Sequence, residues 1–523
     1  MVHYLILCLL FCSGCYQKPQ NISSKRTQLH LSLRYDPLTL DPRKNSDPVS
    51  CSVINFLYTG LTQLEADGSI SLNLADSIEA SKGYTKYTFH LKDALWSNGE
   101  PITAYDFEYS WKKLLSPSFN SLNAHFLYPI KNAKLAKLGL VSTEEVAIFV
   151  EDAKTFYVRL EQPNTYFPKV LAFATCFPIW KNTKDPDDKN NAKVFSGAYI
   201  LEDWKPNDSI LLKKNPYYWN TENILIDTVK LHIVHDEQTI LQLYQKNELD
   251  CIGSVVSPIP HDLIPHVKNS QEACSSDQAG TTFCFFNIQS FPFNNLNIRK
   301  AFYYAINKQE LIDHILQNNE RKAYGIIPPI LKNSKVTKFT PEESLELAKH
   351  HLHLGLKELS LSLDDFPSLV FCYYMSDLEK NLALALQSQW KKTLGISVQL
   401  EGLEVKSFLD KLYKKNYQFC QMSILAQYFD PMSFLERFVY VDGLKNFSGW
   451  ENEEYQRLIK TSFNAKSSQE RLNLLEAAEA VLMSDLPIAP IYHHKGLYLH
   501  HSNLQGVAMN PLGALDYTRC CFH

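Results

Sequence analysis

The side chains with the greatest potential for chemistry in this 523-residue chain are its histidines. They fall into small groups, which are His350, His351 and His353; His493 and His494; His500 and His501; and His232 and His235 near Asp236 and Glu237. A metal site needs side chains that converge on one point with defined geometry. The first group lies at the end of a predicted helix before Gly355, where histidine suits the helix dipole and stays in water. We therefore expect no metal site and no bound cofactor.

The motifs of common catalytic and nucleotide-binding sites are missing from the sequence. It has no GxxxxGK(S/T) loop, so the chain is not the ATPase of a transporter. It has no GxSxG nucleophile elbow, which argues against an α/β-hydrolase. Neighbouring carboxylates such as Asp364 and Asp365 fall in predicted loops, where solvated surface is the simplest interpretation. We expect a protein that is not an enzyme.

The cysteines do not form a recognisable redox or zinc motif. Of the 12 cysteines, those beyond Cys15 lack CxxC spacing, which argues against zinc and thioredoxin-like sites. Two interpretations stay open for them, namely disulfide pairing in an oxidising compartment and burial as small apolar side chains.

Composition excludes some partners. The net charge of −4 argues against a general nucleic-acid surface, which needs clustered lysine and arginine. The chain is 45% hydrophobic and long enough for two to four domains. No run of about 18 apolar residues follows position 15, so no interior membrane helix is expected.

The N-terminus has the features of an export signal. Residues 4–11 form a short, almost wholly apolar run that suits the h-region of a signal peptide. Cys12-Ser13-Gly14-Cys15 then resembles a lipobox, although Cys12 stands where an aliphatic residue is preferred and the n-region has His3 but no lysine or arginine. We expect residues 1–14 to be a signal peptide, Cys15 to be lipidated and residues 15–26 to be a tether. The alternative is an ordinary apolar N-terminus.

Residues 87–111 show how the elements of this chain are specified. Tyr87, Phe89 and Leu91 alternate with polar residues and predict a strand. Asn98-Gly99 predicts a turn, and Thr103 followed by Asp106 resembles a capping box that opens a helix.

Residues 376–394 predict another helix, capped by Ser376 and ended by Gly395, and a strand follows at 396–400. A capping box at Ser467 and Glu470 predicts a helix to about Ser484. Helix, short turn and strand in succession indicate the α/β class.

The same stretch carries a family resemblance. YTFHLKDALWSNGEPITAYDFEYSW resembles FxLRxxxxWSDGxPxTAxDFxxSW, a signature of bacterial extracytoplasmic solute-binding proteins of the dipeptide/oligopeptide class. Further fragments similar to the family's motifs follow in its order: LTLDP at 38–42, LYTGL at 57–61, LEQP at 160–163, SGAY at 196–199, NPYYW at 215–219, and NIRKAF with AINK at 297–308. The resemblance therefore covers most of the chain.

The resemblance implies an α/β, two-lobed periplasmic-binding-protein fold of type II with an inserted subdomain and a ligand cleft between lobes joined by a hinge. Residues 27–63, 185–280 and 490–523 would form lobe I, 64–184 the inserted subdomain, and 281–489 lobe II.

The resemblance also implies site residues. Tyr109 falls where relatives have a ligand-facing tyrosine. The segment AQYFDP at 426–431 resembles ADYNEP, in which the aspartate meets the ligand's α-amine, but Gln427 stands at that position beside Tyr428. Glu379 falls where a histidine contacts the ligand's C-terminus, so Glu379 and Asp430 are the nearest alternative carboxylates for an amine. Gln421 and Ile424 also replace an arginine and a tryptophan.

The function implied is that of a lipid-anchored, monomeric protein on the periplasmic side of the inner membrane. It would bind oligopeptides, cell-wall peptides among them, and deliver them to an ABC permease and through it to the ATPase subunits. Two alternatives stay open: a non-peptide solute such as a nickel chelate, haem or sugar on the same fold, and an extracytoplasmic hydrolase.

Overall fold

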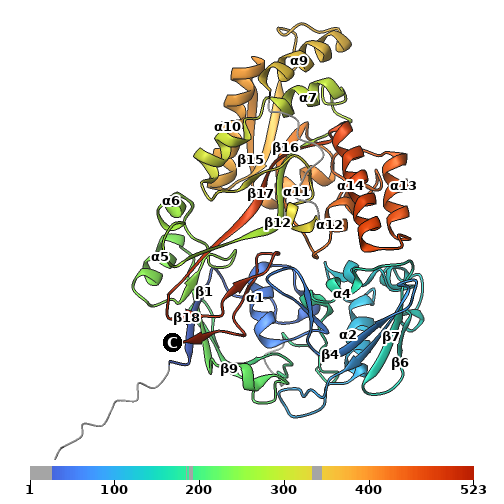
Figure 1. The fold of residues 1–523 in the computed structure, drawn as a ribbon, viewed down its shortest axis with the longest axis vertical. Coiled ribbons are helices and arrows are strands. Elements are labelled where there is room, and N and C mark those ends of the chain that lie inside the picture. Colours follow the sequence, from blue (N-terminus) through green and yellow to red (C-terminus); the bar gives the residue numbers. More distant parts are fainter. Residues whose placement is uncertain (1–25, 184, 188–192, 333–343, 444) are drawn as a thin grey trace, which may run out of the picture.

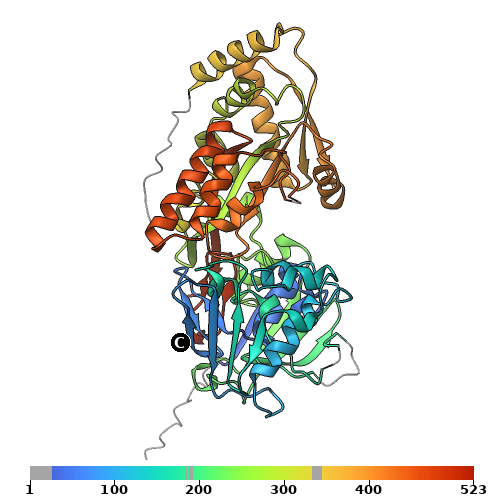
Figure 2. The ribbon, with the colours of Figure 1, turned by 90° about the vertical axis from the view of Figure 1, so that its right-hand side faces the viewer.

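The computed structural model describes residues 26–183, 185–187, 193–332, 344–443 and 445–523. The predicted signal peptide, Cys15 and all but the last residue of the predicted tether lie outside this part of the chain. The described residues form two lobes, one above the other, in both views (Figures 1 and 2). None of their helices is long and apolar enough to cross a membrane.

The lower lobe contains two four-stranded sheets. The first has the order β1 (Gln28–Leu33), β10 (Thr228–Ile233), β9 (Ser209–Lys214) and β8 (Tyr199–Lys205), and β1 is its edge strand. The second has the order β4 (Ala75–Ala80), β5 (Lys86–Leu91), β7 (Thr155–Arg159) and β6 (Ile148–Val150). Helices α1 (Pro48–Leu57) and α2 (Ala104–Leu115) belong to this lobe (Figure 1).

The upper lobe is built around one large sheet. Its strand order is β11 (Cys251–Ile252), β17 (Ile488–His500), β12 (Ala273–Phe286), β16 (Phe419–Leu425), β14 (Leu369–Tyr374) and β15 (Val398–Leu403), and β13 (Arg321–Lys322) also pairs with β17. Its longer helices are α7 (Leu296–Tyr304), α9 (Leu345–Leu359), α10 (Asp377–Leu394), α11 (Val405–Tyr413), α13 (Glu453–Ser462) and α14 (Ser468–Asp485).

Two long antiparallel strands, β12 and β17, run from the upper lobe down to the junction with the lower lobe (Figure 1). Their pairing register shifts between Asp277 and Thr281. Such an irregularity bends a strand and increases its twist locally. The two strands therefore connect the lobes, and their irregularity lies beside the lobe boundary at residue 280 that the family resemblance implies.

The elements predicted from residues 87–111 are confirmed. Tyr87, Phe89 and Leu91 are buried on one face of β5, because alternate strand residues point to opposite sides. Thr103 caps α2, with a reciprocal capping box formed by Asp106. Gly99 has φ +84°, which glycine adopts without steric cost.

The predicted helix at 376–394 is α10, capped by Ser376 and followed by Gly395 at φ +74°, and α14 begins after Ser467 as predicted. One helix end was predicted wrongly: α9 continues through Gly355 to Leu359, so the histidines at 350–353 lie inside it. A Cβ at Gly355 would lie 2.6 Å from Ile298 Cδ1 of α7. This glycine therefore permits close packing of two helices rather than ending one.

The cysteines beyond Cys15 are all free in the structure. Cys176, Cys251, Cys284, Cys372, Cys420 and Cys520 are buried. They act as small apolar side chains of the core.

Candidate functional site

Two adjoining cavities lie between the lobes. The hinge cavity, of about 530 Å³, is lined from below by Gly253–Val255, Pro258 and Ile259 and from above by residues that include Glu320, Tyr374, Glu379, Ser423 and Tyr492. The apolar cavity, of about 250 Å³, is lined by residues of β1, α1 and the 512–518 loop. Four residues line both cavities, namely Ser254, Val255, Leu425 and Gly513, so the two cavities are neighbours.

Glu379 is held rigidly in the wall of the hinge cavity. It lies in the first turn of α10, where its backbone N–H donates to the Oγ of the cap residue Ser376. The Tyr374 hydroxyl donates to Glu379 Oε1 at 2.9 Å, and the Gln421 amide donates to Oε2. The side chain is only 3% exposed, and burial raises the pKa of its carboxyl group above the ordinary value.

Gln427 lies where the two lobes meet. Its Oε1 accepts a hydrogen bond from Lys445 Nζ at 2.9 Å and lies 3.3 Å from Nε2 of His125, which belongs to the other lobe. Burial and the charge of Arg437 lower the pKa of Lys445 to about 8. Burial and the charge of Lys445 lower the pKa of His125 to about 4. At pH 7 Gln427 therefore lies beside a neutral histidine and the ammonium group of Lys445.

Tyr428 forms the next contact between the lobes. Its ring stacks on Tyr166 with the centroids 5.2 Å apart, and its hydroxyl donates to Glu436 Oε2 at 2.9 Å. The Arg471 guanidinium lies 4.8 Å from the centre of the Tyr166 ring. This segment therefore packs directly on the lower lobe.

Asp430 is buried in an ion pair within the upper lobe. Both its carboxylate oxygens accept hydrogen bonds from Arg471, at 2.8 Å each, and both side chains are almost inaccessible. A bidentate pair of this kind satisfies the carboxylate. In this structure Asp430 has no oxygen left without a partner.

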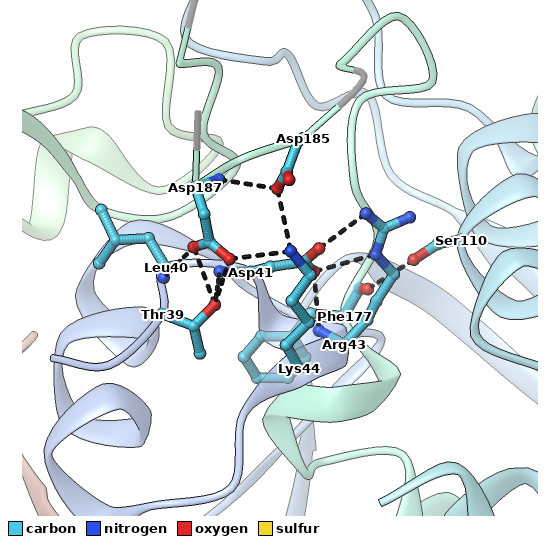
Figure 3. A network of polar contacts seen from close by, with 9 residues as sticks. All are labelled: Thr39, Leu40, Asp41, Arg43, Lys44, Ser110, Phe177, Asp185 and Asp187. Carbon is cyan, nitrogen blue, oxygen red and sulfur yellow. Dashed lines mark hydrogen bonds and ion pairs between the residues drawn. The ribbon is translucent and has the colours of Figure 1, made fainter. Parts of the chain in front are cut away.

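Tyr109 is half-buried on α2 and is not among the residues that line either cavity. It lies near Arg43: burial lowers the pKa of Arg43, but Asp41 and Tyr109 raise it above the ordinary value overall. Figure 3 shows the polar network around Arg43, in which Asp187 accepts hydrogen bonds from the Thr39 hydroxyl and the Leu40 amide.

The structure thus brings together Gln427, Tyr428 and Asp430 at the contact between the lobes. It places Glu379 in the wall of the hinge cavity. Tyr109 lies neither in that cavity nor in the 427–430 segment. Sequence reasoning missed Glu320, His125, Tyr166 and Lys445. Glu320, His125 and Lys445 lie in no local motif. Tyr166 lies in the stretch that begins with LEQP at 160–163, but that motif assigned it no role. All four residues reach the junction through the packing of the lobes. The described residues contain no cluster suited to a metal ion.

Comparisons with known proteins agree with the family resemblance. Residues 69–446 match the family described as bacterial extracellular solute-binding proteins, family 5, middle region. The chain is 33% identical to the oligopeptide-binding protein OppA of Bacillus subtilis over 509 residues, covering 96% of this chain and 93% of that protein.

Solved structures show the same fold. A periplasmic oligopeptide-binding protein from Borrelia burgdorferi superposes with a TM-score of 0.80 at 26% identity, covering 95% of this chain and 100% of that one. OppA of Listeria monocytogenes bound to peptide superposes with a TM-score of 0.74 at 26% identity, covering 95% and 99%.

Proposed function

The chain belongs to family 5 of the bacterial extracellular solute-binding proteins, and we propose that it captures oligopeptides, cell-wall peptides among them, and delivers them to an ABC permease. The observation that carries the proposal is the pair of adjoining cavities where the two lobes, connected by β12 and β17, meet. Pockets that bind small ligands usually have volumes of about 300–1,000 Å³, and the hinge cavity, of about 530 Å³, falls in this range.

The walls of the cleft suit an extended peptide. β1 is the edge strand of its sheet, and its residues 31–33 line the apolar cavity. An edge strand offers backbone groups to a peptide that lies alongside it. A peptide held there would contact both lobes only when they are closed, so binding would favour closure by population shift.

We assign residues 27–63, 185–280 and 490–523 to lobe I, 64–184 to the inserted subdomain and 281–489 to lobe II. Of the five residues expected to bind the ligand, Glu379 is assigned to the hinge cavity. We assign to Gln427 and Tyr428 the contacts that hold the two lobes together when they close. We assign to Asp430 the role of holding Arg471 in place, and to Tyr109 the role of supporting Arg43.

Peptide binding is tested with the purified protein by native mass spectrometry, calorimetry and small-angle scattering. A matched peptide at about 100 times its Kd should stabilise the protein by about 2.7 kcal/mol and make it more compact. If peptides of about two to eight residues neither bind nor compact the protein, the proposal is wrong and a non-peptide solute takes its place.

We propose further that the protein is exported and anchored through lipid on Cys15. The apolar run and lipobox-like sequence at the N-terminus support this. Each buried CH₂ of an acyl chain contributes about 0.8 kcal/mol to membrane binding. Cys15→Ala should therefore move the protein from the membrane fraction to the soluble periplasm, and unchanged fractionation would refute lipid anchoring.

A further inference from the structure

Glu379 differs from the other buried carboxylates in how its charge is balanced. Among the described residues, Asp41, Asp250, Asp430 and Glu479 each form an ion pair, with Arg43, Arg26, Arg471 and Lys332 respectively. Asp106 has no cationic partner, but it receives several hydrogen bonds at the start of α2. Glu379 is bound by three neutral donors, the Tyr374 hydroxyl, the Gln421 amide and the Ser423 hydroxyl.

A buried carboxylate without a cation carries a large desolvation cost unless something supplies the missing charge. No described lysine, arginine or histidine forms an ion pair with Glu379, and none contributes to the shift of its pKa. Glu379 lies in the wall of a cavity that opens between the lobes. A ligand in that cavity is therefore in a position to supply the charge.

The other polar groups of the hinge cavity suit a positive group. Tyr374, Ser423 and Tyr492 offer hydroxyl oxygens as acceptors. His494 also lines the cavity, but burial lowers its pKa to about 4, so it is neutral at pH 7. Lys495 is the lysine that lines the cavity, and its charge acts on Glu320.

The shape of the group follows from the hydrogen bonds that Glu379 already makes. The Tyr374 hydroxyl and the Gln421 amide occupy one oxygen each and the Ser423 hydroxyl adds a third hydrogen bond, so few lone pairs remain for the planar fork of a guanidinium. An ammonium is a compact charge with three donors and can bind one oxygen and nearby hydroxyls. Leu316, Leu378 and Leu425 line the same cavity and provide apolar surface for an aliphatic stem.

We propose that the hinge cavity binds a primary ammonium group of the peptide, with Glu379 as its counter-ion. This makes Glu379 a specificity-determining residue, and it rests on the proposed function of peptide capture. The ammonium can come from a lysine-type side chain or from the peptide's own α-amine, and the experiment separates these two sources.

The test uses calorimetry on the full-length protein with a lysine-containing peptide that binds it. One arm replaces lysine by norleucine, which removes the charge and keeps the stem, and the other acetylates the N-terminus. Each peptide is measured with the wild-type protein, with Glu379→Gln and with Glu453→Gln. Glu453 is exposed on the same lobe and serves as a matched control.

In the wild-type protein, one of the two changes to the peptide is expected to weaken binding about tenfold or more, and that change identifies the source of the ammonium. In Glu379→Gln the same change should weaken binding less than about threefold, whereas Glu453→Gln should behave as the wild type. Glu379→Asp retains the charge but withdraws it by one methylene, so it should give an intermediate loss. This variant also serves if Glu379→Gln does not fold, as judged from its melting curve.

The inference is overturned if peptides bind but neither change weakens binding in the wild-type protein. It is also overturned if the weakening is the same in Glu379→Gln as in the wild type. Failure of every peptide to bind would overturn the proposed function and this inference together, so the two failures are distinguishable.

Discussion

Asp430 and Glu379 are both buried carboxylates of the upper lobe, 4% and 3% exposed, yet their charges are balanced in different ways. Asp430 has a bidentate arginine partner within the same lobe. Glu379 has only neutral donors and lies beside a cavity. A charge that the chain neutralises itself contributes to the fold, whereas a charge left without a cation at a cavity is available to a ligand.

The same contrast holds for the two ends of the junction between the lobes. Away from the hinge, Gln427 and Tyr428 already contact His125 and Tyr166 of the lower lobe. Beside the hinge, the lobes enclose the cavity that contains Glu379. Closure and ligand recognition are thus assigned to different ends of one junction, and this division can be tested by changing each end separately.

The largest effect is expected from Arg471→Met. This change leaves Asp430 buried without its cation, and breaking a buried ion pair in this way costs about 3–5 kcal/mol. Urea unfolding should show a loss of that size. The double variant Arg471→Met with Asp430→Asn removes both charges and should recover most of the stability. A small loss in the single variant would show that Asp430 is solvated or has another partner.

A pH effect is expected at the end of the junction away from the hinge, where Gln427 contacts His125. His125 has a pKa of about 4 in the folded protein, below the ordinary value of 6.5, so its contribution to stability is present above pH 6.5 and is lost as the pH falls to 4. One such group gives a slope of at most about 1.4 kcal/mol per pH unit. The unfolding free energy of His125→Asn should fall less steeply over this window than that of the wild type.

The control for His125 is His353→Asn, because His353 is exposed on α9 and lies away from the junction between the lobes. This variant should keep the wild-type pH profile. Equal slopes for the wild type and His125→Asn would show that His125 is not desolvated at the junction between the lobes.

At the end of the junction beside the hinge, Glu379→Gln is expected to stabilise the unliganded protein by roughly 1–2 kcal/mol at pH 7. Replacing an uncompensated buried charge by a neutral group of the same size removes its desolvation cost. The pKa of Glu379 is raised by folding, so this cost is present above the ordinary pKa and disappears as the carboxyl group is protonated. Chemical denaturation of the two proteins at pH 7 and at pH 4 measures the difference, which should shrink at pH 4.

The sequence predicted the framework of these two ends better than their chemistry. Ser376 and Gly395 identify the ends of α10, and therefore the position of Glu379 in its first turn, because caps act locally. The motif around Gln427 located the segment that meets the other lobe. Lys445 and His125 could not be predicted as its partners, because they are 18 and 302 residues away and converge only through tertiary packing. The helix end predicted at Gly355 was wrong for the same reason, because this glycine allows α9 to pack closely against α7.

The smallest effect is expected from Gln427→Asp. A carboxylate at this position would restore the acidic residue of the related motif, but Lys445 Nζ already lies 2.9 Å from the Gln427 side chain and would pair with the new charge. A ligand amine would then gain little, so free and N-acetylated forms of one peptide should differ by no more than about tenfold from their wild-type ratio, about 1.4 kcal/mol. Adding Lys445→Met frees the carboxylate and should increase the preference for the free amine. A strong preference in Gln427→Asp alone would show that the ligand reaches this residue and that Lys445 does not neutralise it, and recognition would then extend to both ends of the junction.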